Sequence, residues 1–363
     1  MEEVLDMVTN VKNTFLSLIR LGIGHPVPNR FGKIDWKATE ALAEQQGLLA
    51  ILVDGVEKLP DDHKPSKLVL LQWIGESLQE YEYRYELYQR AISELAGWYN
   101  AHGFKMMVLK GYACSSNWPK PEHRPCGDID IWLFGQQKEA DATLFKEKGI
   151  KVDNSYHHHT VFYWHDFMVE NHYDFINVHA RSSNVELEKV FKKLGADDSH
   201  SVEVNGERVY LPSPNLHALF LVRHNVAHFT SASVSLRQIL DWAFFVEKHT
   251  KEIDWVWLVE LLKKNHMLDL YNTINAICVD DLGFDAKIFP YVKYNPVLKE
   301  KVLDDILYPQ YTADEPSCLI PRLIYKYKRW NGNRWKHELC YKESMWSVLW
   351  SSTWSHLLKP SSI

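Results

Sequence analysis

The sequence has few of the residues that define several protein classes. Its 363 residues include 16 glycines and 15 prolines, too few for a collagen-like chain or a low-complexity linker. The five cysteines are odd in number, and no two stand at CxxC spacing, so neither a disulfide framework nor a cysteine zinc site is indicated. They are Cys114, Cys126, Cys278, Cys318 and Cys340.

Long apolar runs and an excess of basic charge are missing as well. No apolar segment reaches membrane-spanning length, and the first ten residues carry acids where a signal peptide has basic residues. Lys and Arg number 41 against 47 Asp and Glu, and the net charge of −6 argues against a nucleic-acid partner. We therefore expect a soluble, cytoplasmic protein.

The chain divides by pattern into three regions. Residues 1–98 and 213–363 have apolar residues at helical spacing, which predicts helical regions at both ends. Residues 99–212 read as a small α+β domain with a mixed sheet between them. Its expected elements are strands at 104–109, 127–133 (half-buried), 159–164 and 167–173, a helix at 137–148, and a hairpin at 202–210 with an Asn205-Gly206 turn.

Two carboxylates two residues apart are the clearest chemical signal. Asp128 and Asp130 lie on a predicted strand, so both side chains point to one face. Crowded carboxylates are tolerable when a cation lies between them, and oxygen ligands with open positions suit Mg²⁺. The pair is a candidate metal site.

A candidate phosphate turn precedes this strand. An apolar run leads into Lys110-Gly111, and a glycine at a strand-to-helix turn lets backbone N–H groups approach a phosphate. Lys110 adds positive charge, and Arg124 carries the planar fork that suits phosphate.

A third acid is expected on a later strand. Glu170 shares a strand face with His172. Asp174 is the rival candidate for the third acid, because the two-residue period of a strand puts it on the same face.

These residues carry a resemblance. The chain resembles the uncharacterised nucleotidyltransferase family of bacterial polysaccharide gene clusters, within the DNA polymerase β-like superfamily. The resemblance covers about residues 100–260. It rests on Leu109-Lys-Gly111, Trp118-Pro-Lys-Pro, Arg124, Gly127-Asp-Ile-Asp130, Val169-Glu-Asn-His172, Leu221-Val-Arg-His-Asn-Val-Ala-His228 and Leu236-Arg-Gln-Ile-Leu-Asp-Trp242.

The resemblance implies a nucleotidyltransferase with two Mg²⁺ ions that moves NMP from an NTP to a hydroxyl acceptor on a saccharide or a protein. Asp128, Asp130 and Glu170 would hold the metals, and Glu170 would help to activate the acceptor. Lys110 and Gly111 would cradle the triphosphate, with Arg124 nearby. The alternative is a non-catalytic nucleotide- or partner-binding module, because the turn departs from the Gly-Gly or Gly-Ser of the superfamily and the third acid is Glu rather than Asp.

The roles of two pairs of helical residues stay open: each pair either belongs to the site or serves helix packing. His224 and His228 are spaced i, i+4, so they share a face and either line the groove, where they would meet nucleotide, or pack. Arg237 and Asp241 have the same spacing. They either pair along their helix or face the catalytic region, where Arg237 would bind nucleotide.

For two other clusters, packing is the preferred interpretation. His157, His158 and His159 should alternate faces and not converge on a metal, although His172 shares the face of Glu170 and is a candidate nucleotide-binding residue. A last helix at about 337–358 carries an aromatic stripe, read as core. The preceding segment 322–342 has a local charge of +6, and contact with a membrane surface is the secondary interpretation.

Overall fold

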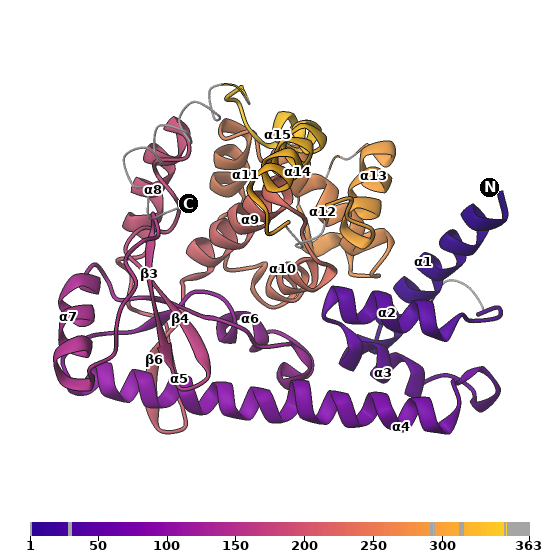
Figure 1. Ribbon diagram of the computed structural model, residues 1–363, viewed down its shortest axis with the longest axis horizontal. Coiled ribbons are helices and arrows are strands. Elements are labelled where there is room, and N and C mark those ends of the chain that lie inside the picture. The colour runs from indigo at the N-terminus through magenta and orange to yellow at the C-terminus, as the bar shows by residue number, and fades with distance from the viewer. Residues whose placement is uncertain are drawn as a thin grey trace.

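We analysed a computed structural model that describes residues 2–27, 31–290, 293, 295–311, 316–344 and 346 (Figure 1). The first hundred residues are helical, as predicted. Their elements are α1 (Glu2–Gly22), α2 (Trp36–Gln46), α3 (Leu49–Glu57), the 3-10 turn η1 (Asp61–His63), α4 (Lys67–Glu76), the π-helical turn η2 (Ser77–Tyr83) and α5 (Arg84–Ala101).

The helices α4 and α5 form one long rod through η2, because no proline interrupts residues 67–101. In Figure 1 this rod runs along the bottom of the molecule, beneath the strands, and connects the helices α1–α3 to the sheet. The apolar side of α5, including Tyr88, Ile92 and Leu95, is fully buried against the sheet. The rod therefore supports the back of the sheet.

The sheet has six described strands in the order β3-β4-β2-β1-β6-β5. β1–β2, β3–β4 and β5–β6 are antiparallel, whereas β2–β4 and β1–β6 are parallel, so the predicted mixed sheet is confirmed. The bounds are β1 (Met107–Val108), β2 (Ile129–Trp132), β3 (His159–Trp164), β4 (Phe167–His172), β5 (Ser201–Val204) and β6 (Glu207–Tyr210).

The two sheet faces pack against different helices. Ile129, Ile131 and Val169 share a core with α5 and with α7 (Gln137–Lys148). Met107 and Trp132, which point the other way, belong to the core formed with the C-terminal helices. The strand β2 is therefore buried on both faces, and the expectation of a half-buried strand is wrong.

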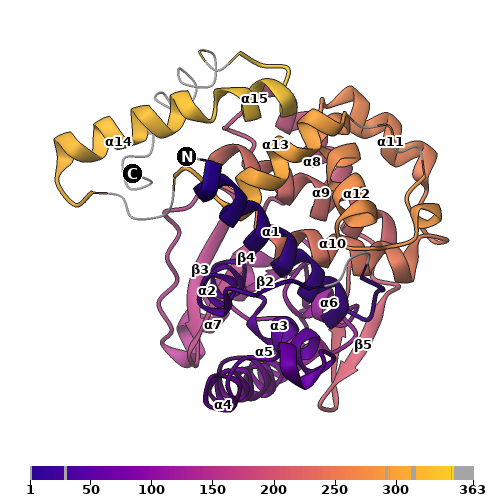
Figure 2. The ribbon, with the colours of Figure 1, turned by 90° about the vertical axis from the view of Figure 1, so that its right-hand side faces the viewer.

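Helices after the sheet cover the second face (Figure 2). Among the described residues, no helix combines the length and apolarity needed to cross a membrane. Some helical elements lie between strands: α6 (Tyr112–Ser115) and η3 (Pro121–His123) between β1 and β2, and α8 (Ser182–Leu194) between β4 and β5. The elements that follow the last strand are α9 (Pro214–Ser231), α10 (Leu236–His249), α11 (Trp255–Lys264), α12 (Leu268–Asp280), η4 (Ala286–Ile288), α13 (Pro296–Leu307), α14 (Leu319–Gly332) and α15 (Arg334–Cys340).

Most of the last predicted helix, 337–358, lies outside the described residues. The described helix α15 ends at Cys340, because Tyr341 has an extended backbone, with φ −139° and ψ 147°. Trp346, the first residue of the expected aromatic stripe, is 63% exposed and therefore not core. The other two members, Trp350 and Trp354, lie outside the described residues.

A buried ion pair ties the N-terminal helices to the loop that precedes β2. His123 Nδ1 lies 2.7 Å from Asp54 Oδ2 of α3, and both side chains are buried. Burial opposes the charge on each group, but the contact raises the pKa of His123 and lowers that of Asp54. The pair therefore stabilises the fold when both groups are ionised.

We predict that His123→Gln lowers the free energy of unfolding by about 2 kcal/mol at pH 6, since Asp54 loses one charged hydrogen bond and keeps only the ion pair with Lys120, whose Nζ lies 2.5 Å from Asp54 Oδ1. The contribution of a His with a raised pKa is complete below its unfolded value, near 6.5, and is lost as the pH rises through its folded value. The difference from wild type in urea unfolding should therefore be smaller at pH 9 than at pH 6. An equal difference at both values would contradict the ion pair.

Candidate active site

The register of two parallel strands brings three carboxylates together. Asp130 of β2 pairs with Glu170 of β4, and aligned residues of paired strands point to the same face. Asp128, directly before β2, lines the same cavity as these two side chains. The expected convergence of Asp128, Asp130 and Glu170 is thus present in the geometry.

The rival third acid points elsewhere. Asp174 lies beyond the end of β4, and its Oδ1 is 2.5 Å from Lys192 Nζ of α8. It does not line the cavity. Glu170 is therefore the third carboxylate of the cluster.

Lys110 balances the two aspartates. Its ammonium lies 3.4 Å from Asp128 Oδ2 and 3.1 Å from Asp130 Oδ1. Burial alone would raise the pKa of Asp130, but Lys110 and His172 hold it well below the usual value. The pKa of Glu170 moves the other way, to about 7, because of burial and of the charge on Asp130.

The cluster fits a divalent cation. Asp130 is 1% exposed, and its Oδ2 is buried without a hydrogen-bond partner among the described residues. A buried carboxylate oxygen without a partner is costly, and a cation would satisfy it. Three carboxylates supply the oxygen ligands that Mg²⁺ prefers.

A glycine is needed at position 111 because of a neighbouring side chain, and not only to bring backbone N–H groups near a phosphate as we expected. Gly111 has φ +59°, and a Cβ there would lie 2.1 Å from the hydroxyl of Tyr88 on α5. That hydroxyl donates to the backbone oxygen of Asp128 at 2.9 Å. The glycine therefore makes room for a contact that positions Asp128, although Gly111 also lines a small cavity beside Lys110.

We predict that Gly111→Ala costs at least about 2 kcal/mol of stability, since it adds overpacking to the strain of a positive φ. Gly103→Ala is the matched control, because Gly103 also has positive φ, at +79°, but has no atom within 4 Å of an added Cβ. Urea unfolding of the two variants separates the Tyr88 contact from the strain alone. Equal losses would show that the Tyr88 contact contributes nothing.

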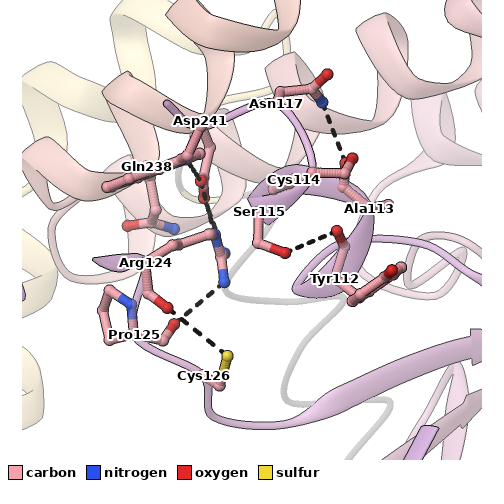
Figure 3. Close-up of polar contacts among 12 residues, drawn as sticks. Tyr112, Ala113, Cys114, Ser115, Asn117, Arg124, Pro125, Cys126, Gln238 and Asp241 are labelled. Atoms are coloured by element: carbon pink, nitrogen blue, oxygen red, sulfur yellow. Dashed lines mark hydrogen bonds and ion pairs between the residues drawn. The ribbon is translucent and has the colours of Figure 1, made fainter. Parts of the chain in front are cut away.

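Arg124 forms a buried ion pair and also lines the small cavity beside Lys110 and Gly111, so its expected place near the triphosphate stays a prediction. Its Nε and Nη2 donate to the two oxygens of Asp241 on α10, at 2.7 and 2.9 Å (Figure 3). Trp118 Nε1 also donates to Asp241 Oδ1 at 2.8 Å. Asp241 therefore pairs across the molecule and not along its own helix with Arg237.

Arg237 lies at the same small cavity but outside the ion pair of Arg124. This cavity of about 150 Å³ is lined by both arginines together with Lys110, Gly111 and Asp128. The guanidinium of Arg237 has no hydrogen-bond partner among the described residues. Burial and the nearby Arg124 lower its pKa, as expected where positive charge is crowded. An anion would relieve this crowding.

The histidines of α9 also lie at the site. His224 and His228 line both this cavity and the larger one, and their ring centroids are 4.2 Å apart. Burial and Lys110 lower both pKa values, that of His228 to about 4. They are therefore neutral groups on the cavity wall.

The larger cavity, of about 980 Å³, is also lined by two arginines that the sequence did not single out. Arg181 stacks 3.5 Å from the centroid of Tyr341 and contacts His337 Nε2 at 2.6 Å. Arg223 is 5% exposed, donates to Asn184 at 3.3 Å, and has an Nη1 atom without a partner among the described residues. Arg223 stands beside His224 in the sequence, but no pattern pointed to Arg181.

Two of the three consecutive histidines meet His172, although we expected the segment to alternate faces and pack; His157 is not among these candidate ligands. Ligand atoms of His158, His159 and His172 lie within 4.8 Å of one another. The alternation that we assumed applies only within a strand, and β3 begins at His159, so His158 is free of it. His172 also lies 3.2 Å from Asp130 and 3.7 Å from Glu170.

Comparison with known proteins defines the family. The family described as "uncharacterised nucleotidyltransferase" matches residues 32–279, more than half of the chain, and the chain belongs to this family. A solved nucleotidyltransferase-like antigenic protein from Paracoccidioides brasiliensis is 12% identical, over 55% of this chain and 95% of that chain, with a TM-score of 0.34. No curated protein matches the chain.

Proposed function

We propose that this protein is a Mg²⁺-dependent nucleotidyltransferase that moves NMP from an NTP to a hydroxyl group. The observation that carries the proposal is the cluster of Asp128, Asp130 and Glu170 in one cavity, with an orphaned buried oxygen on Asp130. Membership of a nucleotidyltransferase family supports it. The saccharide or protein nature of the acceptor stays a prediction.

The three carboxylates would hold the metal. When bound, Mg²⁺ neutralises charge on the phosphates and on the attacking and leaving oxygens. The acceptor oxygen forms a bond to the α-phosphorus, the bond from this phosphorus to the bridging oxygen breaks, and pyrophosphate leaves. Glu170 lies next to Asp130 on the paired strand and would accept the proton of the hydroxyl.

Positive side chains next to the carboxylates would orient the triphosphate. Lys110 and Arg237 line the small cavity that adjoins Asp128. The larger cavity extends from the carboxylates to Arg181 and Arg223, so it has room for the nucleoside and the acceptor. In this proposal the phosphates and the acceptor would lie on different sides of the carboxylates.

One observation favours the non-catalytic alternative. Lys110 already contacts both aspartates, so part of the charge that a metal would balance is balanced by the protein. In a binding module of this kind, nucleotide binding would need no divalent cation. Metal dependence therefore separates the two functions.

We predict that one of the four NTPs raises the melting temperature only in the presence of Mg²⁺, because ligands of the native state stabilise it by mass action. The variant Asp128→Asn/Asp130→Asn should lose this shift. A shift that survives without Mg²⁺ or in the double variant would favour the binding module. The absence of a shift with any NTP would contradict both.

We predict different effects for the two arginines. Arg237→Gln should weaken Mg²⁺·NTP binding by about tenfold, as expected for the loss of a charged hydrogen bond, with little loss of stability. Arg124→Gln should instead lower the free energy of unfolding by about 3 kcal/mol, since it leaves Asp241 buried and unpaired. Calorimetric titration and urea unfolding measure the two effects, and Arg90→Gln, an exposed position on α5, is the control.

An Arg237→Gln variant that binds NTP as wild type does would remove this residue from the proposed phosphate site. A stable Arg124→Gln variant with weakened NTP binding would restore Arg124 to that site.

A further inference from the structure

We infer that the histidines beside the carboxylates form a mixed nitrogen and oxygen metal position that selects a transition-metal dication over Mg²⁺. The ligands are His159 and His172 with Asp130 and Glu170, and His158 lies at their edge. The inference deepens the proposed function and rests on it in part, because it concerns the metal of the same site.

The donor atoms share one small region. Ligand atoms of Asp130, Glu170 and His172 lie within 4.8 Å of one another, as do those of His158, His159 and His172. His172 belongs to both groups and links them. His159 Nδ1 lies 3.9 Å from Glu170 Oε2, so the second histidine reaches the carboxylates as well.

A neutral His172 cannot satisfy both of its contacts with acceptor oxygens. Its Nδ1 lies 3.2 Å from the backbone oxygen of Asp174, and its Nε2 lies 3.2 Å from Asp130 Oδ1. Both partners accept hydrogen bonds, and a neutral imidazole has a single N–H to donate. Either a second proton or a metal ion is needed to satisfy the other contact. Donation from Nδ1 to a backbone carbonyl is the usual arrangement that leaves Nε2 free to bind a metal.

His159 provides the independent evidence for a metal. It is 6% exposed, and neither of its ring nitrogens has a hydrogen-bond partner among the described residues. Its ring centroid lies 5.3 Å from that of His172 and 4.4 Å from that of His158. An added proton on His172 would leave both nitrogens of His159 unsatisfied, whereas a metal would satisfy one of them.

The ligand types determine which metal is favoured. Mg²⁺ takes oxygen ligands, but imidazole suits Zn²⁺, Co²⁺ and Ni²⁺, and the affinity of such sites rises along the first-row divalent series. Adjacent ligands about 2.1 Å from one ion stand about 3 Å apart, close to the separation of His172 Nε2 and Asp130 Oδ1. A position with two imidazoles and two carboxylates therefore favours the transition metal.

The test uses Co²⁺ as the probe on the full chain after removal of metals with a chelator. Calorimetric titrations with Co²⁺ and with Mg²⁺ give the two affinities, and the visible absorption of Co²⁺ reports imidazole ligation. We expect Co²⁺ to bind at least tenfold more tightly than Mg²⁺. His159→Gln should reduce Co²⁺ affinity tenfold or more and Mg²⁺ affinity by less, so the preference falls.

His165→Gln is the matched control, because His165 is an exposed histidine in the turn between β3 and β4 and pairs with Glu94. It should keep the full preference for Co²⁺. Circular dichroism melting shows whether each variant is folded, and His158→Gln offers a second, less central change if His159→Gln does not fold.

A Co²⁺ affinity no greater than that of Mg²⁺ would overturn the inference. So would a preference that both His159→Gln and His158→Gln leave unchanged. Selective Co²⁺ binding without any NTP binding would contradict the proposed nucleotidyl transfer and leave the metal position standing. Mg²⁺-dependent NTP binding without a preference for Co²⁺ would reject only the metal inference.

Discussion

The burial of negative charge where β2 and β4 pair is the constraint on which the rest of the site depends. The register that aligns Asp130 with Glu170 places two carboxylates beneath the C-terminal helices, where ionised acids are costly unless they are compensated. Lys110 supplies part of the compensation from the end of β1. It does not satisfy Asp130 Oδ2, and Glu170 responds with a raised pKa. The remaining deficit of positive charge is what a metal site requires.

The contacts that position the loop before β2 at this site also stabilise the fold. Tyr88 connects the long rod to Asp128, and the Arg124–Asp241 pair connects the loop before β2 to α10. The Asp54–His123 pair joins the same loop to α3. The loop that positions Asp128 is therefore attached to helices on both sides of it. A substitution at any of these contacts acts on the site through the position of the loop.

Features that depend on neighbouring residues could be predicted from the sequence, whereas contacts between residues far apart in the chain could not. The strands, the Asn205-Gly206 turn and the shared face of Asp128 and Asp130 depend on neighbours along the chain, and alternation or turn chemistry predicts them. The partner of Arg124 is 117 residues away, and the hydroxyl that requires Gly111 belongs to another element. Arg124 and Arg237 look alike in the sequence as phosphate-binding residues. Only the packing of α10 decides that Asp241 pairs with Arg124 and not with Arg237, although both arginines line the small cavity.

The large cavity is lined by side chains of both charges, and this constrains what can occupy it. Asp128, Asp130 and Glu170 line it together with Arg181 and Arg223. Tyr341 contacts both guanidinium groups, and the adjoining His337 is neutral because burial and Arg181 lower its pKa to about 4. An anionic group is therefore stabilised beside the arginines, but beside the carboxylates only when a cation accompanies it.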